Sequence, residues 1–327
     1  MFFALTEDQQ EFGAAVRGYL AERFDLAAVR GVVEDTDGDG NPATLWKAAW
    51  EQGWLAVTVP EEFDGLGLGL VEAQVIARAL GAGVAPGPWR GTVLAAEAIR
   101  LAGTDEQKAT WLPRLAAGTA VGALAADRTL AVVEYGAIAD VVVTPDGLLV
   151  TGASSTPRGS YDGTVRLADL TGGTVEELAA APEIRSRAAV LVAADLVGIA
   201  REALTRTVAY DRERRQFGVP VGSFQSIKHT LADLHCTITM AEHAALYAAH
   251  AVEVGDEDAP LAVAVAKAKA GDAAVASTGA LIQYHGGIGY TWEHEAHLFY
   301  KRAKRLAGQW GDSATHRARI AELTMGG

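Results

Sequence analysis

The chain has 327 residues, of which 50% are hydrophobic and 21% charged, a balance that excludes a disordered protein and suits one large domain or two to three small ones. Its formal net charge of -13 argues against nucleic acid as the main partner, although a local basic patch could still hold a phosphorylated cofactor. A single cysteine rules out an intrachain disulfide, and the polar, acidic start predicts no signal peptide. Charges interrupt every apolar run, so no segment is long enough to span a membrane. Together these features predict a cytoplasmic protein.

The first region, residues 1–122, is predicted to be helical. Thr6 followed by two acidic residues is typical of a helix start, where negative charge suits the macrodipole. Apolar residues then recur at helical spacing at Phe12, Val16, Tyr19 and Leu20. The same kind of pattern predicts further helices over residues 71–80, 93–101 and 103–118.

Two glycine-rich loops in this region resemble ligand-binding loops only in part. The segment EDTDGDGNPATL lacks the terminal Glu of an EF-hand, so we interpret it as a solvated loop and not as a calcium site. Gly65, Gly67 and Gly69 lie outside any βαβ unit, so they do not predict a dinucleotide-binding fingerprint.

The second region, residues 123–178, changes character. The segment VVVTPDGLLVTG predicts a β-hairpin around Pro145, Asp146 and Gly147. The neighbouring pieces TLAVVEY and GTVRLADL are short and strand-like. The region is small for an independent β-domain, so we predict a small β insert.

The third region, residues 179–327, returns to helix. One long helix is predicted over residues 187–215, a third helix after Pro260 and a fourth over residues 293–306. The second helix starts near Ser223, with apolar residues at Phe224, Ile227, Leu231, Leu234 and Ile238. Four long helices favour a bundle, in which Cys236 is predicted to be an inert core residue.

Two segments of the third region carry a family resemblance, YDRERRQFGVPVGSFQSIKHTLADL and IQYHGGIGYTWEHEAHLFYKRAK. Both resemble C-terminal domain signatures of the acyl-CoA dehydrogenases. The earlier pieces LTEDQQEF, GWLAVTVPEEFDGLGLG and TDEQKATWLPRLAAG resemble the same family in the same order. The resemblance implies a mainly α fold with a small β insert: an N-terminal helical domain (1–122), a shortened middle β-domain (123–178) and a C-terminal four-helix bundle (179–327).

The resemblance also implies a chemistry. Acyl-CoA dehydrogenases bind FAD between their domains and a neighbouring subunit, and they desaturate an acyl-CoA thioester. The flavin takes a hydride from the β carbon, as expected where the cofactor carries the difficult chemistry. A glutamate takes a proton from the α carbon as general base.

By resemblance, seven residues reach across a dimer interface to the adenosine and pyrophosphate of the neighbour's FAD: Arg214, Gln216, Phe217, Gln225, Gln283, Gly286 and Gly287. Their chemistry agrees with that role, because a guanidinium suits pyrophosphate and paired glycines permit close backbone approach. Taken singly, Arg214 could simply face solvent and the His-Gly-Gly segment could simply form a turn. That interpretation carries less weight here, because both motifs occur in the family's order on a family-like framework. His285, His294 and His297 lie close in sequence, but turn packing explains them better than a metal site does.

The sequence departs from the family at the positions that serve a chain's own catalysis. The Thr-Glu-Pro and Gly-Ser-Asp segments that embrace the flavin ring are missing from VGALAADRTLAVVEYG. The two places where family members carry the base hold Trp310 and Ala188, so no catalytic residue is assigned. Asp312, Asp195 and Glu293 remain as candidates for a displaced base.

These losses favour a degenerate subunit that shares FAD with a catalytic homologue. The chain resembles the short subunits of heteromeric actinobacterial acyl-CoA dehydrogenases that act on sterol side-chain thioesters. The alternatives are a self-sufficient homodimeric dehydrogenase with a displaced base, and a non-enzymatic acyl-CoA or FAD binding protein. The acyl substrate and the electron acceptor stay open.

Overall fold

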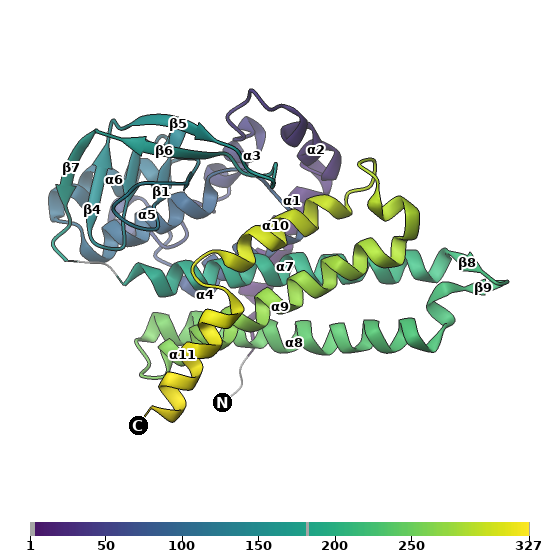
Figure 1. Ribbon diagram of the computed structural model, residues 1–327. Helices are drawn as coiled ribbons and strands as arrows, with labels where there is room; N and C mark the ends of the chain where they lie inside the picture. Colours follow the sequence, from purple (N-terminus) through teal and green to yellow (C-terminus); the bar gives the residue numbers. More distant parts are fainter. Residues whose placement is uncertain (1–3, 181–182, 327) are drawn as a thin grey trace. The chain divides into compact units, whose positions relative to one another are not determined.

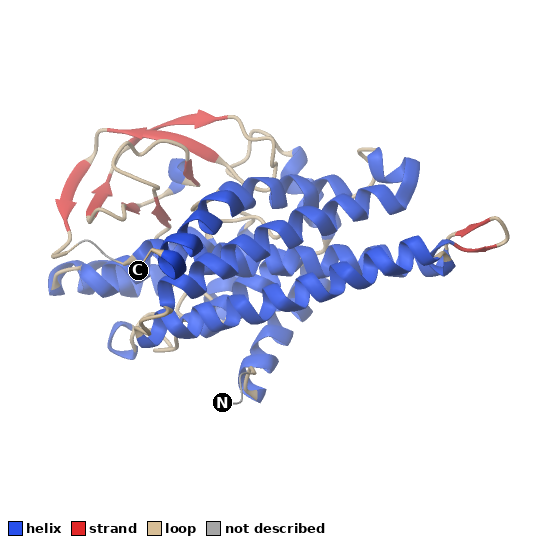
Figure 2. Cartoon of the chain, turned by 60° about the horizontal axis from the view of Figure 1, so that its bottom comes forward, coloured by secondary structure: helices blue, strands red, loops and turns tan. Residues whose placement is uncertain are grey.

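Helices make up most of the chain in the computed structural model, which describes residues 4–180 and 183–326 (Figures 1 and 2). The described chain divides into two units, which we call the bundle unit (4–26, 74–85 and 189–326) and the strand unit (27–73, 86–180 and 183–188). The predicted fold class, mainly α with a small β insert, is confirmed. The three-domain boundaries drawn from the sequence stay a prediction.

The bundle unit consists almost entirely of helices. They are α1 (Glu7–Arg23), most of α4 (Leu70–Ala82) and α7 (Ile184–Glu213), α8 (Gln225–Val254), α9 (Ala259–His285), α10 (Ala296–Gly308) and α11 (Ser313–Met325). A short hairpin of β8 (Arg215–Gln216) and β9 (Val219–Pro220) joins α7 to α8, and two 3-10 turns, η3 (Val221–Ser223) and η4 (Gly286–Tyr290), follow the hairpin and α9. Figure 1 shows α8, α9 and α10 running side by side.

Local sequence explains where the first of these helices begins. Thr6 is the N-cap of α1, and its side chain accepts a hydrogen bond from the backbone of Gln9, whose side chain accepts one from the backbone of Thr6. This reciprocal capping box satisfies two donors that the helix leaves without partners. Val16 and Leu20 then turn inward as the apolar spacing predicts.

The helices that close the chain differ from the prediction. The predicted fourth helix starts at Ala296 and not at Glu293, because His294 accepts a hydrogen bond from the Ala296 backbone (3.1 Å) and holds a turn there. A further helix, α11, follows, and Asp312 caps it by accepting from the Thr315 backbone (2.8 Å). Sequence reasoning had not included α11.

The prediction that Cys236 is a core residue was wrong, since this thiol is exposed. The buried stripe of α8 runs through Leu234, Ile238 and Ala241. Cys236 follows Leu234 by two residues, which turns it roughly 200° around the helix and away from that stripe. The apolar spacing correctly located the helix but did not show which side this residue faces.

The helices of the bundle unit approach closely where small residues face one another. A Cβ on Gly81 of α4 would lie 2.2 Å from the Asp195 carbonyl oxygen of α7, and one on Gly198 would lie 2.0 Å from the Arg78 carbonyl oxygen. Only glycine fits at these two backbone contacts. The buried face of α9 is likewise built mostly of alanine.

The strand unit combines helices with two small sheets. Its helices are α2 (Leu26–Glu34), α3 (Ala43–Glu51), η1 (Glu61–Phe63), α5 (Trp89–Ala102), α6 (Asp105–Ala116) and η2 (Gly136–Ile138). Its strands are β1 (Gly122–Leu124), β2 (Val133–Glu134), β3 (Val141–Val143), β4 (Leu148–Thr151), β5 (Ser154–Arg158), β6 (Leu167–Thr171) and β7 (Thr174–Glu177). The four-stranded sheet has the order β1-β3-β4-β7, and the three-stranded sheet has the order β2-β6-β5.

The predicted hairpin is confirmed as β3 and β4. The two strands pair antiparallel, with Val142 opposite Val150, and Gly147 takes the left-handed conformation of the turn at φ 88°. Val142 and Val150 also belong to the apolar cluster that joins the two sheets. Across residues 4–180 and 183–326, no helix combines the length and the apolar character that crossing a membrane needs.

Candidate functional site

The first resembling segment forms the β8–β9 hairpin at one end of the bundle unit (Figure 1). Arg214 follows α7 directly; its backbone N–H donates to Tyr210 (2.9 Å) and its carbonyl accepts from Val221 (2.8 Å), which closes the hairpin. Phe217 stands at the tip with φ 53° and 92% of its surface exposed. The hairpin therefore presents its side chains outward, and Gln216 is exposed beside the tip.

The hairpin leads into α8, whose first residue is Gln225. Gln225 is exposed, and so is the ring of Phe224 just before it. The Phe224 and Phe217 rings meet edge to face, with their centroids 6.3 Å apart. This aromatic pair ties the hairpin tip to the start of α8 and leaves one face of Phe217 available to a flat ligand.

The second resembling segment lies at the carboxyl end of α9. Gln283 is exposed on the last turn of that helix, and Gly286 ends the helix at φ 65°. Around Gly286 and Gly287, no atom lies within 4 Å of the place where a Cβ would stand. The backbone is thus bare here, and a ligand could approach it closely.

A ring contact brings the two segments together. Tyr210, four residues before Arg214, stacks on His285 with ring centroids 4.2 Å apart and an interplanar angle of 23°. The His285 Nδ1 atom lies 2.7 Å from the Leu281 carbonyl oxygen, and the His294 ring lies 4.5 Å away. Burial lowers the pKa of His285, so the imidazole is neutral at neutral pH and packs as a ring.

The seven residues implied by the resemblance are all exposed, in two sets linked through this ring pair. They supply one guanidinium, three amides, an exposed phenyl ring and an open stretch of glycine backbone. Those groups are complementary to a pyrophosphate and an adenosine, since a guanidinium and N–H donors bind phosphate oxygens and a ring stacks on a base. The donor set therefore fits one end of an FAD molecule.

The first base position of the family lies in the turn between α10 and α11, where this chain carries Trp310 at φ 57°. The Trp310 carbonyl accepts from His316 Nε2 (3.0 Å). Below the turn, the Nζ atom of the fully buried Lys267 donates to the carbonyls of Ala307 and Gly311, both at 2.9 Å. Burial also lowers the pKa of Lys267 to about 8. The turn is held by contacts within the chain and carries an indole at the position where the resemblance implies a carboxylate.

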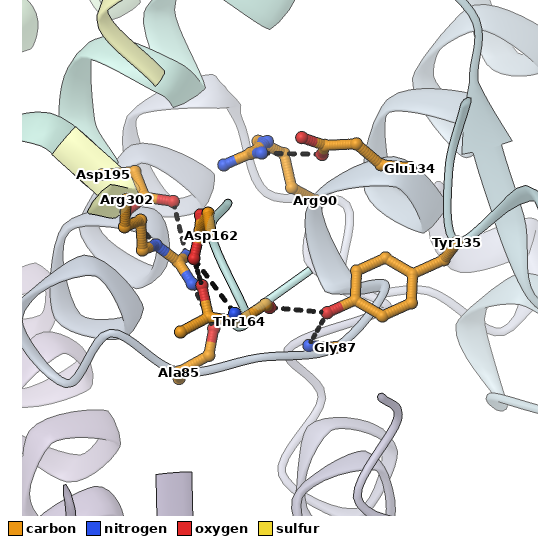
Figure 3. Close-up of polar contacts among 9 residues, drawn as sticks. All are labelled: Ala85, Gly87, Arg90, Glu134, Tyr135, Asp162, Thr164, Asp195 and Arg302. Carbon is orange, nitrogen blue, oxygen red and sulfur yellow. Dashed lines mark hydrogen bonds and ion pairs between the residues drawn. The ribbon is translucent and has the colours of Figure 1, made fainter. Parts of the chain in front are cut away.

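Two of the three displaced-base candidates already have structural partners. Both oxygens of the buried Asp195 accept from Arg302, at 3.2 Å from Nε and 2.7 Å from Nη2, and Arg302 also donates to the Ala85 carbonyl (2.8 Å; Figure 3). Asp312 caps α11, and its hydrogen bonds from Thr315 hold the pKa of its carboxyl below the usual range. Glu293, in the turn before α10, is exposed.

The segment that would embrace a flavin ring in the family is engaged inside the strand unit. Glu134 forms an ion pair with Arg90 (2.7 Å), and the Tyr135 hydroxyl donates to the Thr164 carbonyl (2.9 Å) and accepts from the Gly87 backbone (2.6 Å; Figure 3). The second base position, Ala188, is a fully buried methyl group in the same unit. These side chains serve the fold, and none is a carboxylate free for proton transfer.

Sequence reasoning missed one buried ion pair, Asp195 with Arg302, and the burial of Lys267 and Asp211. The Asp195–Arg302 pair could have been suspected, because Asp195 interrupts the apolar run AAVLVAADLVGIA and a lone charge there needs a partner. Lys267, in an alanine-rich helix, gives a similar signal. Asp211 lies inside the first resembling segment, yet nothing in its neighbours marks it as buried.

Comparison with known proteins identifies the family. Residues 6–119 match the acyl-CoA dehydrogenase N-terminal domain, and residues 185–325 match the acyl-CoA dehydrogenase C-terminal domain. The acyl-CoA dehydrogenase IpdE2 of Mycobacterium tuberculosis is 38% identical over 301 residues, which cover 91% of each chain.

Two solved structures are similar over nearly the whole chain. A variant of the Tcur3481-Tcur3483 steroid ACAD superposes with a TM-score of 0.89 at 28% identity, covering 98% of both chains. The ChsE4-ChsE5 complex of Mycobacterium tuberculosis gives the same TM-score, 0.89, at 24% identity and 99% coverage of both chains, which shows the shared fold. With both of its terminal regions matched and a relative this similar over 91% of its length, the chain belongs to the acyl-CoA dehydrogenase family.

Proposed function

We propose that this chain is a subunit of an FAD-dependent acyl-CoA dehydrogenase that lacks its own catalytic base and completes the FAD site of a catalytic homologue. One contrast carries the proposal. The residues suited to a neighbour's cofactor are exposed at one end of the bundle unit, whereas the two base positions hold an indole and a methyl group. The steroid ACAD and the ChsE4-ChsE5 complex are each named for two chains, which supports a two-chain enzyme here.

In that enzyme, bound FAD would accept the hydride from the β carbon of the acyl-CoA. The residues of this chain would bind and orient it. The Arg214 guanidinium would hold the pyrophosphate, the amides of Gln216, Gln225 and Gln283 would donate to polar atoms of the nucleotide, and the bare backbone at Gly286 would let it approach. The base that takes the α proton would belong to the partner. The substrate class we propose is a steroid-derived or fatty acyl-CoA thioester.

The engaged side chains of the strand unit support the same proposal. A self-sufficient enzyme needs a carboxylate with no structural duty, and Asp195 and Asp312 both have one. A homodimer with a displaced base is the second hypothesis, and a non-enzymatic FAD or acyl-CoA binding protein is the third. Flavin content and turnover separate them.

The full chain purified alone is expected to hold little or no FAD, because the segment that would embrace the flavin ring makes contacts within its own unit instead. Co-purified with a longer acyl-CoA dehydrogenase homologue, it is expected to carry about one FAD per pair of chains. The measurement is the flavin absorbance per protein at equal concentrations. A yellow single chain with one FAD per copy would contradict the proposal.

Arg214→Ala is expected to weaken FAD binding in the two-chain complex about ten- to a hundredfold, since losing a charge-assisted bond to phosphate costs roughly 1.5–3 kcal/mol. Arg214→Lys should recover part of the affinity, because an ammonium does not reproduce the two parallel N–H bonds of a guanidinium. FAD affinity is measured by flavin fluorescence. The matched control is Arg215→Ala, which removes a neighbouring exposed guanidinium of β8. Equal losses in both alanine variants would indicate a general charge effect and not a specific contact.

A further inference from the structure

A buried carboxylate lies at the base of the β8–β9 hairpin. Asp211 is on the last turn of α7, three residues before Arg214, and only 1% of its surface is exposed. Within the described part of the chain, neither carboxylate oxygen receives a hydrogen bond. A buried carboxylate without a donor is costly in free energy, so such an arrangement calls for an external partner.

Asp211 forms part of the wall of a hollow of about 370 Å³ between α7, the hairpin and α8. Val208, Pro220 and Leu231 give the hollow an apolar lining. Gly222 keeps the chain close to α7, since a Cβ there would lie 3.0 Å from the Asp211 carbonyl oxygen. The result is an apolar recess with one anionic group in its wall. It lies directly beside the β8–β9 hairpin, which under the proposed function faces the partner subunit.

The other charged groups lining the hollow are Arg212 of α7 and Lys228 of α8. Both side chains are exposed, and neither forms an ion pair with Asp211 within the described residues. The chain therefore places two cations on the walls of the hollow but does not neutralise its buried anion. A metal ion is a poor occupant, because a single carboxylate is far fewer oxygen ligands than a calcium or magnesium ion requires.

The geometry points to this hollow as the seat of a basic side chain from the partner subunit, whose guanidinium or ammonium group pairs with Asp211. Apolar walls suit the aliphatic stem of an arginine or lysine, and the carboxylate suits its charged head. The inference rests on the proposed function in one respect, namely that the hairpin lies at a subunit interface. It adds a specific anchor of that interface, separate from the seven cofactor residues.

Burial raises the pKa of Asp211 to about 6 in the single chain, and pairing with a cation would lower it again. Association then requires the ionised carboxylate, so it should weaken as the pH falls from 7 to 5.

The test uses the full chain and its co-purified acyl-CoA dehydrogenase homologue, with their dissociation constant measured at pH 7 and pH 5. Asp211→Asn, which keeps the shape and removes the charge, is expected to weaken association about ten- to a hundredfold at pH 7 and to abolish the pH dependence. Asp233→Asn, the same change at an exposed carboxylate of α8 outside the hollow, is the matched control and should leave association unchanged. Equal affinity and equal pH dependence in wild type and Asp211→Asn would overturn the inference, as would an Asp233→Asn variant that reproduces the Asp211→Asn loss.

A second measurement does not need the partner. It distinguishes failure of this inference from failure of the proposed function. Ethylguanidinium chloride is titrated into the single chain while the backbone amide of Gly222, in the wall of the hollow, is followed by NMR. A saturable shift in wild type that is missing from Asp211→Asn supports a cation seat even if no homologue associates, in which case only the proposed function fails. No saturable shift in wild type overturns the cation seat itself.

Discussion

The single chain, supplied with FAD, is expected to dehydrogenate no acyl-CoA thioester. Proton abstraction next to a thioester needs a base within hydrogen-bond reach of the α proton, and its loss alone typically costs about a hundred- to ten-thousandfold in rate. Trp310 and Ala188 accept no proton, and Asp195 and Asp312 are engaged with Arg302 and Thr315. With a poorly held flavin in addition, turnover should fall below detection.

The measurement is reduction of an artificial electron acceptor by a panel of fatty acyl-CoA and steroid-CoA thioesters, with and without the partner. Glu293→Gln and Asp312→Asn are the informative variants, because the first residue is exposed in a turn and the second caps a helix. Turnover by the single chain that disappears in Glu293→Gln would replace the subunit proposal with a displaced base. Turnover that appears only with the partner, and is unchanged in both variants, supports it.

Asp195→Ala is expected to lower the free energy of unfolding by about 3–5 kcal/mol, one of the largest losses available to a single substitution here. Asp195 and Arg302 form an ion pair at 2.7 Å with side chains only 4% and 7% exposed, so removing the carboxylate leaves a buried guanidinium without its counter-charge. Urea denaturation of the full chain measures the change.

Two controls distinguish this loss from the removal of any ion pair. Glu322→Gln breaks the exposed pair with Arg319 and should change stability by at most about 1 kcal/mol. The double variant Asp195→Leu with Arg302→Met should recover most of the loss, because an apolar pair of similar volume replaces a buried ion pair at little cost. An Asp195→Ala chain within about 1 kcal/mol of wild type would show that water reaches the pair, contrary to its burial.

Local rules in the sequence predicted the elements that depend on near neighbours. Thr6 and Gln9 predict the start of α1, and the residues around Gly147 predict the β3–β4 hairpin. The spacing of Leu234 and Ile238 likewise predicts α8 and part of its buried stripe. Each of these elements is determined by residues only a few positions away, so it can be predicted from a single sequence.

What depends on distant partners could not be predicted. Asp195 pairs with Arg302, which lies 107 positions away in the sequence. Asp211 is buried in the folded chain, and none of its sequence neighbours indicates this. Cys236 shows the same limit, since its exposure follows from which neighbours cover the other side of α8. The motif residues were found through family resemblance; the structure adds the Tyr210 ring contact through which the two motifs meet.

The alanine-rich face of α9 has a consequence for the cofactor end of the molecule. Alanine methyl groups project little from the helix and interdigitate weakly with neighbouring side chains. Such a helix could therefore shift along its axis with little loss of packing contacts. Lys267 opposes that shift, because its buried ammonium is bonded to two carbonyls of the α10–α11 turn. His285, which ends α9, lies 18 residues further on, or roughly 27 Å along the helix. This charged side chain deep in the bundle thus helps to set the axial registry of α9, on which the placement of Gly286, at the distant end, depends.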